Sequence, residues 1–245
     1  MERKREDKEY TEGISLKGGF WGWLENFWYH YKWHTVGVVA LVTVVLVCTL
    51  QMCAKEEHDV RVVYSGSAYL TESEAASMVE IFEYVMPSDF DGDGEKSAAV
   101  SNFYILTEEQ IKKIEAETDE DGNKQYVDKS YITAEKSSYD DYLMKGESSI
   151  LILEPWLYEA LIEEDRLLEL SELGGEYEEL SFDGYGVRLG SLPIYKKYKI
   201  LQKLPEDTVI CMNQKYIVGR SSNDKVYDFE KEMFKAIIGF TYEGK

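Results

Sequence analysis

Two hydrophobic patterns divide the chain. Residues 35–54 read TVGVVALVTVVLVCTLQMCA and contain no charged residue, whereas from residue 59 onward apolar positions alternate or recur at helical spacing. Twenty helical residues span about 30 Å, the thickness of the hydrocarbon core of a bilayer. A buried core helix is the alternative, but a valine-rich run of this length is typical of a membrane. We therefore predict a transmembrane helix over residues 35–54.

An aromatic segment precedes the apolar run. Residues 20–34 hold four of the five tryptophans of the chain, together with several phenylalanines and tyrosines. Aromatic rings with polar edges favour the headgroup layer of a membrane, so we predict an interfacial helix that continues into the span. A docking surface for a partner helix is the alternative interpretation. Residues 1–19 are then a flexible tail.

The flanks of the apolar run predict an uncleaved anchor. No small-x-small cleavage site follows the run, and neither Cys48 nor Cys53 is preceded by the small residue that lipoprotein processing needs. Basic residues close to the run are balanced on its two sides, but four of the first eight residues are basic. This bias favours a cytoplasmic N-terminus. We expect a single-pass cell-membrane protein with residues 59–245 outside the cell.

Strand and helix patterns alternate through residues 59–245. Strands are predicted over residues 59–66, 97–106 and 148–155 and in YGVRLG, DTVICMN and KYIVG, and helices over residues 71–86, 107–117, 138–146, 156–170 and 226–240. Thr71 and Glu74 form a capping box for the first of these helices, and Pro87 ends it. Such alternation predicts an α/β domain, with a sheet covered by helices on both faces.

One stretch carries a resemblance to a known family. In YDDYLMKGESSILILEPWLYEAL (139–161) a helix ends at a glycine, an apolar strand follows, and a new helix starts after an acidic residue and a proline. This stretch resembles extracellular solute-binding proteins of the type II periplasmic-binding fold, and YGVRLG, LPEDTVICMN and the closing helix resemble their later portion. The whole chain is similar to a family of membrane-anchored proteins of Gram-positive gut bacteria. The resemblance implies two lobes, or one reduced lobe, with a cleft at the strand ends.

Polar and aromatic residues just past two strands are candidates for ligand contact. Side chains at these positions point into the crevice of an α/β sheet. The candidates are Ser65, Ser67 and Tyr69 after the first strand, and Glu154 and Trp156 after ILIL. Ordinary capping or packing is the alternative for each of them.

Three alternating aspartates, Asp89, Asp91 and Asp93, are followed by a glycine, as in the start of a calcium loop. An EF-hand is excluded, because Val100 stands where a bidentate glutamate is required and a strand follows in place of a helix. Two interpretations remain. One is a weak single-loop calcium site formed by the three aspartates and Glu95. The other is a metal-free turn in which the glycines supply permissive backbone angles.

Charge and histidine content exclude several functions. Residues 1–53 hold six of the 27 basic and six of the 47 acidic residues, so the whole net charge of −20 lies in the remainder. Such a surface repels phosphate backbones and excludes nucleic acid as a partner. All three histidines lie beside the membrane, which leaves none for a nucleophile or zinc site in the domain. Chance carboxylate pairs keep glycoside hydrolysis open as an alternative.

These observations predict a non-catalytic protein that is tethered to the lipid bilayer and needs no cofactor beyond the calcium considered above. Its domain is a solute-binding-like module for a small molecule. The alternative is an accessory subunit that docks a membrane-protein partner and has no small ligand. An open cleft between two lobes favours the first function, and one lobe with a filled crevice favours the second.

Overall fold

The computed structural model describes residues 19–53, 58–118 and 124–241. It divides the chain into two compact units, Met1–Glu57 and His58–Lys245. The predicted tail, except for residue 19, and the last residue of the predicted span lie outside the described residues.

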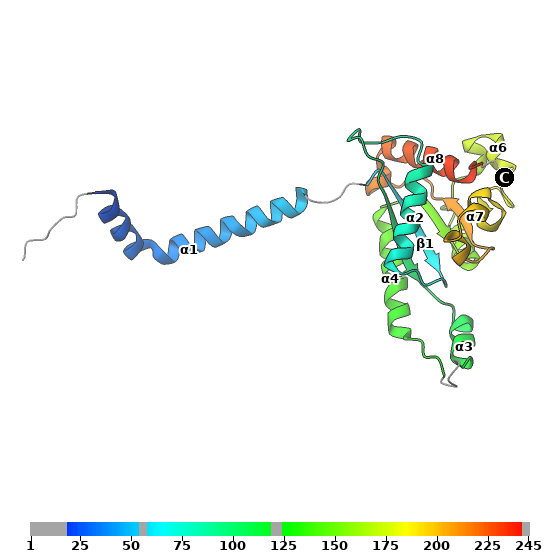
Figure 1. Ribbon diagram of the computed structural model, residues 1–245, viewed down its shortest axis with the longest axis horizontal. Coiled ribbons are helices and arrows are strands. Elements are labelled where there is room, and N and C mark those ends of the chain that lie inside the picture. The colour runs from blue at the N-terminus through cyan, green and yellow to red at the C-terminus, as the bar shows by residue number, and fades with distance from the viewer. Residues whose placement is uncertain (1–18, 54–57, 119–123, 242–245) are drawn as a thin grey trace, which may run out of the picture. The chain divides into compact units, whose positions relative to one another are not determined.

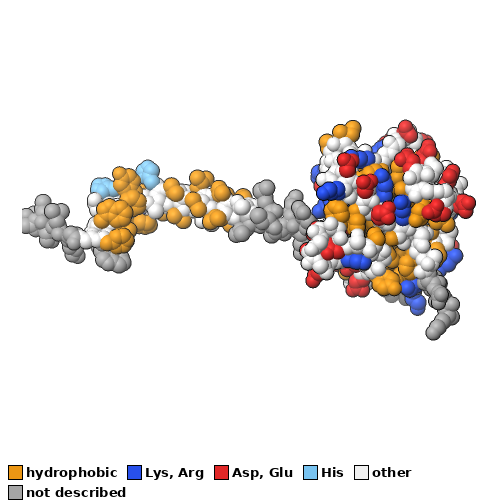
Figure 2. Space-filling model, turned by 90° about the horizontal axis from the view of Figure 1, so that it is seen from above, with side chains coloured by type: hydrophobic (Ala, Val, Ile, Leu, Met, Phe, Trp, Pro, Cys, Tyr) orange, Lys and Arg blue, Asp and Glu red, His pale blue; other side chains and the backbone are white. Residues whose placement is uncertain are grey.

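The described part of the first unit is one continuous helix, α1 (Phe20–Cys53). Aromatic residues four positions apart stack along it, Trp23 on Phe27 with ring centroids 5.5 Å apart and Phe27 on Tyr31 at 5.3 Å. Residues Asn26–Thr49 form a stretch that is long and apolar enough to cross a membrane. None of the most apolar part of this stretch is buried. Apolar side chains cover much of this helix (Figure 2). The aromatic segment therefore continues into the apolar run as one helix, with the length and composition of a membrane span or a signal sequence.

The second unit is built on one five-stranded mixed sheet in the order β2-β1-β3-β5-β4. The strands are β1 (Val60–Gly66), β2 (Ala98–Tyr104), β3 (Ile150–Leu153), β4 (Gly186–Arg188) and β5 (Val209–Met212). β1 is parallel to both β2 and β3, and β5 is antiparallel to both β3 and β4. The predicted α/β class is confirmed.

Helices connect these strands and begin at residues that the sequence marks as caps. The α-helices are α2 (Glu72–Val85), α3 (Glu108–Ala116), α4 (Lys129–Lys145), α5 (Pro155–Glu163), α6 (Gly175–Glu178), α7 (Pro193–Lys197) and α8 (Asp224–Ile238), and the short 3-10 turns are η1 (Leu170–Leu173), η2 (Leu189–Ser191), η3 (Leu201–Lys203) and η4 (Arg220–Ser222). The Thr71 amide donates to Glu74 at 3.0 Å, as the predicted capping box requires. Thr107 and Gln110 form a second capping box at α3.

Successive residues of each central strand face opposite sides of the sheet, and both sides are covered. Val62 and Tyr64 of β1 pack in a cluster with α2 and α8, whereas Val63 packs in a cluster with α4 and α5. All four residues of β3 are buried, because helices lie on both faces (Figure 1). This explains why ILIL is continuously apolar rather than alternating.

Three predicted elements need correction. KYIVG (215–219) is not a strand, because the chain leaves the sheet after Met212 and turns toward the end of α4. The helix predicted over residues 156–170 ends at Glu163, since Asp165 adopts a left-handed conformation with φ 54° and the following leucines pack under the sheet edge. The helix predicted from residue 138 starts at Lys129, where Asp128 caps the first turn by accepting from two amides.

An arm extends past the carboxyl ends of the parallel strands. It consists of α3 and the first half of α4 (Figure 1). A small separate apolar cluster of Leu106, Ile111, Val127 and Ile132 holds it together. Residues 58–118 and 124–241 form one sheet and one compact unit.

Candidate functional site

Four of the five predicted ligand-contacting residues come together at the carboxyl ends of β1 and β3. Glu154 follows β3 directly and stands at the N-cap of α5, where Pro155 starts the helix. Its amide donates to the Ser65 carbonyl at 3.1 Å, so strand pairing extends one residue beyond β3. Ser67 and Trp156 both donate to the Glu154 carboxylate, each to a different oxygen.

The Glu154 carboxylate is surrounded by hydrogen-bond donors. Oε1 accepts from the Ser67 amide at 2.7 Å and also from the Ser67 hydroxyl. Oε2 accepts from Gln110 Nε2 at 3.0 Å and from Trp156 Nε1 at 3.3 Å. Glu154 is 4% exposed, and a Cβ on Gly66 would lie 2.7 Å from its Cγ. The Glu154 side chain therefore fills the predicted crevice, and its charge is satisfied within the protein.

The phenols beside Glu154 stay protonated. Burial is the main cause that raises the pKa of Tyr64 far above its ordinary value, and the Glu154 charge adds to it. Burial followed by Glu154 raises the pKa of Tyr104 as well. The Tyr64 hydroxyl accepts from the Ala68 amide at 2.9 Å. Both phenols therefore keep their protons near neutral pH.

Tyr69, the fifth predicted residue, lies at the surface next to this cluster. It is 61% exposed, and its ring packs edge-on against Tyr104 with centroids 5.7 Å apart. Two further tyrosines are exposed, Tyr126 at 85% just before α4 and Tyr131 at 45% in its first turn. We call Tyr69, Tyr126 and Tyr131 the arm tyrosines.

The Trp156 side chain donates to Glu154 and also lines a cavity. It lines a cavity of about 330 Å³ between α3 and α4, together with Ile105, Ile111 and Ile132. Tyr69 is not among the residues that line this cavity.

The structure places Asp59 beside the aspartates of the turn at residues 89–95, although the sequence pattern did not single it out. Carboxylate oxygens of Asp59, Asp89 and Asp91 lie within 4.8 Å of one another, and Asp93 and Glu95 are not part of this group. Asp89 accepts from the amides of Gly92 at 2.7 Å and Gly94 at 2.8 Å. In the sequence Asp59 only opens the strand predicted over residues 59–66, and its burial directly before β1 is known from the structure.

Opposing electrostatic effects act on the aspartates of this turn. The Asp93 amide lowers the pKa of Asp91, but desolvation and the charges of Asp93, Asp59 and Asp89 outweigh it, and the net pKa of Asp91 is raised. The pKa of Asp89 is lowered by the amides of Gly94 and Gly92. A divalent cation would relieve the repulsion at Asp91, whereas the backbone amides already stabilise the turn without one.

Calcium binding at this turn stays a prediction with a measurable consequence. A site with a dissociation constant of about 1 mM gives about 1.4 kcal/mol of stabilisation at about 10 mM calcium. This corresponds to a rise in Tm of about 3–5 °C for a domain of this size. Replacing Asp91 with Asn should abolish the rise, measured by differential scanning fluorimetry. An equal rise with magnesium, or in the Asp91→Asn variant, would contradict a specific site.

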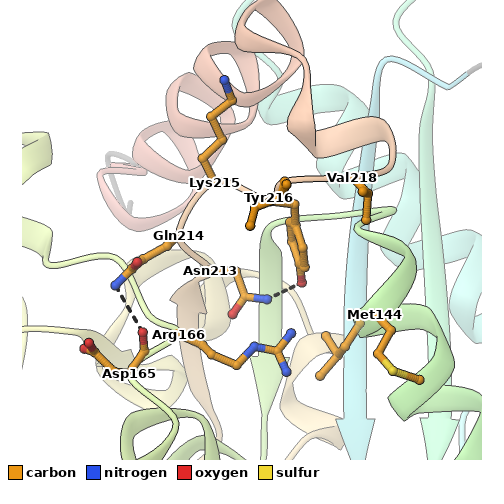
Figure 3. Close-up of a pocket in the computed structure, with 10 residues that line it drawn as sticks. Met144, Asp165, Arg166, Asn213, Gln214, Lys215, Tyr216 and Val218 are labelled. Atoms are coloured by element: carbon orange, nitrogen blue, oxygen red, sulfur yellow. Dashed lines mark hydrogen bonds between the residues drawn. The ribbon is translucent and has the colours of Figure 1, made fainter.

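A second cavity lies at the opposite end of the sheet. It measures about 320 Å³ and is lined in part by Arg166, Asn213 and Tyr216 (Figure 3). The sequence interpretation missed these residues, because it placed Arg166 in a helix and both Asn213 and Tyr216 in strands. Asn213 directly follows a buried strand, which is the one local signal that could have nominated it.

Comparison of the chain with protein-family models, with curated proteins and with solved structures returns no match.

Proposed function

We propose that the chain is a single-pass membrane protein whose second unit is an accessory module that docks a membrane-protein partner. The observation that carries this proposal is the filled crevice. Glu154 occupies the position where a solute would bind, and donors from three residues satisfy its carboxylate. A solute receptor of this fold class needs an open crevice at the strand ends.

The arm tyrosines supply the docking surface in this proposal. Tyrosine is enriched in the buried parts of protein interfaces, because it offers a large rigid contact area together with a polar hydroxyl. Three exposed tyrosines on or beside a projecting arm match that composition. The net charge of −20 favours a partner with a basic surface, since complementary charge accelerates association.

A reduced type II binding-protein fold is the proposed origin of this module. The stretch that carries the sequence resemblance forms the end of α4, then β3, then α5. It delivers Glu154 to the end of a parallel strand, as the resemblance implies. Loss of one lobe would remove the closing half of a ligand cleft and leave the Glu154 crevice free to be filled from within.

Co-purification from native membranes tests the docking proposal. The tagged full chain should be recovered in the membrane fraction and should elute from mild detergent in a complex. Replacing the three arm tyrosines with serine should lower the partner yield at least tenfold, because truncated interface aromatics commonly cost about 2 kcal/mol or more. Quantitative mass spectrometry of the eluate measures this loss.

Tyr84 provides the matched control. It is 69% exposed but belongs to α2, away from the arm. Tyr84→Ser should retain the partner at the wild-type level. A wild-type chain that elutes alone would overturn the proposal, as would equal partner yield from the triple variant. A chain found in the water-soluble fraction would overturn the membrane tether itself.

A further inference from the structure

The cavity at the amino ends of the parallel strands combines polar groups with an apolar wall. It lies between the end of α4, the residues after α5 and the loop that follows β5. Its volume of about 320 Å³ is at the lower end of the range for small-molecule sites. Its apolar side is formed by Leu143, Met144, Ile217 and Val218, and the Ile217 side chain is 97% exposed.

Asn213 leaves one polar atom without a partner at this cavity. It is 1% exposed, and its Nδ2 donates to the Tyr216 hydroxyl. Among the described residues, its Oδ1 atom accepts no hydrogen bond. A buried acceptor without a donor is costly, so this oxygen marks a position where a donor is missing.

Arg166 and Tyr216 supply donors next to that oxygen. The Arg166 guanidinium points toward Asn213 and Tyr216, whereas Lys215 points away (Figure 3). Since the Tyr216 hydroxyl accepts from Asn213, its own proton is available for another acceptor. Burial raises the pKa of Tyr216 and outweighs the hydrogen bonds from Asn213 and Arg166, which lower it, so this proton stays in place. Arg166 pairs with Glu164 through Nη1 at 3.2 Å, which occupies one of its two terminal nitrogens.

The rim of the cavity is held in a fixed conformation. Gly219 has φ 86°, and a Cβ at this residue would overlap the Lys145 carbonyl oxygen. Gly146 caps α4 with φ 60°, and a Cβ there would overlap the Val218 carbonyl oxygen. The Ser221 amide donates to the Gly146 carbonyl at 2.9 Å. The loop therefore packs directly on the end of α4, which makes the cavity preformed.

We infer that this cavity binds a small carboxylate with an apolar side chain and an adjacent N–H donor. The Arg166 guanidinium and the Tyr216 hydroxyl match the carboxylate. The N–H donor satisfies Asn213 Oδ1, and the apolar side chain covers Met144, Ile217 and Val218. A free hydrophobic α-amino acid and the last residue of a peptide share this chemistry. The site is independent of the docking proposal, because it lies at the other end of the sheet.

Isothermal titration of the purified full chain in detergent tests the site. Leucine and the dipeptide Ala-Leu are the two probes, and the stronger one identifies the source of the carboxylate. Leucinamide, which lacks the carboxylate, should bind at least tenfold more weakly, because a hydrogen bond to a charged group is among the stronger ones in proteins. For the same reason, Arg166→Gln should lower the binding affinity at least tenfold.

Two variants keep the outcome interpretable. Lys215 borders the cavity, but its side chain points away from it (Figure 3) and pairs with Asp224, so Lys215→Gln removes an equal charge and should bind like wild type. Tyr216→Phe removes only the hydroxyl and should weaken binding about three- to tenfold, even if Arg166→Gln disturbs folding. Absence of binding by both probes at about 10 mM overturns the proposal, and so does equal binding of leucinamide or an unchanged affinity in Tyr216→Phe.

Discussion

Replacing Arg220 with methionine should lower the free energy of unfolding of the second unit by about 3–5 kcal/mol. Arg220 Nη1 donates to Glu230 Oε1 at 2.9 Å, and the Glu230 side chain is completely buried. Nη2 donates to the carbonyl oxygens of His58 and Asp59, the first described residues of this unit. Removing the guanidinium leaves the buried carboxylate without a countercharge, with the Ser221 hydroxyl still donating to it at 3.0 Å, and releases the start of β1.

A double variant separates the charge from the packing. Arg220→Met with Glu230→Met removes both charges, and apolar replacement of a complete buried pair is often neutral. Equilibrium urea titration of the full chain should therefore show the double variant closer to wild type than the single variant. A single variant within about 1 kcal/mol of wild type, or a double variant no better than the single one, would contradict the proposed role of the pair.

The stability loss of the single variant Arg220→Met should depend on pH in a defined way. Burial raises the pKa of Glu230 above its ordinary value of 4.5, and Arg220 partly offsets this. Without Arg220 the folded-state pKa rises further. Below the folded-state pKa of the wild type, Glu230 is protonated in both folded proteins, so its charge adds nothing to the deficit of Arg220→Met. The deficit grows as the pH rises from the wild-type folded-state pKa toward the higher pKa of the variant, because over this range only the wild-type folded chain ionises Glu230. Urea titrations at about pH 4.5 and about pH 7.5 measure the difference.

Replacing Gly219 with alanine is expected to lower the free energy of unfolding by about 2–5 kcal/mol. The left-handed backbone at φ 86° strains any residue with a Cβ. The new methyl group would also clash with the Lys145 carbonyl oxygen, a backbone atom that cannot rotate away. The loop must then lift from α4, which also displaces Ile217 and Val218 from the cavity rim.

Gly94 offers a matched control for this substitution. Its φ is 99°, but no atom of the described residues lies within 4 Å of the position that a Cβ would take. Gly94→Ala therefore adds only the conformational strain of about 1–2 kcal/mol. Thermal and urea unfolding of both variants should rank Gly219→Ala as clearly less stable. Equal losses would show that the close contact with α4 contributes nothing.

Local patterns along the chain determined the elements and their order. The capping box at Thr71, the glycine after Lys145 and the apolar run before Glu154 each act within a few residues of the chain, so they could be read directly. Length and composition alone were enough to predict the apolar helix, and the alternation of strands and helices was enough to predict the α/β class. Chain geometry at strand ends also brought Ser65, Ser67, Glu154 and Trp156 into one candidate site.

Tertiary structure alone decided which groups meet across long separations. Gln110 reaches Glu154 from 44 residues away, and Arg220 reaches Asp59 from 161 residues away. No local pattern encodes such contacts, because they depend on how the helices pack on the two faces of the sheet. The same packing overrode β propensity at residues 215–219, where close contact with α4 bends the chain into the cavity rim. The sequence therefore determined most of the elements and their order, and packing determined where a predicted strand did not form, that one crevice is filled and that another cavity is left open.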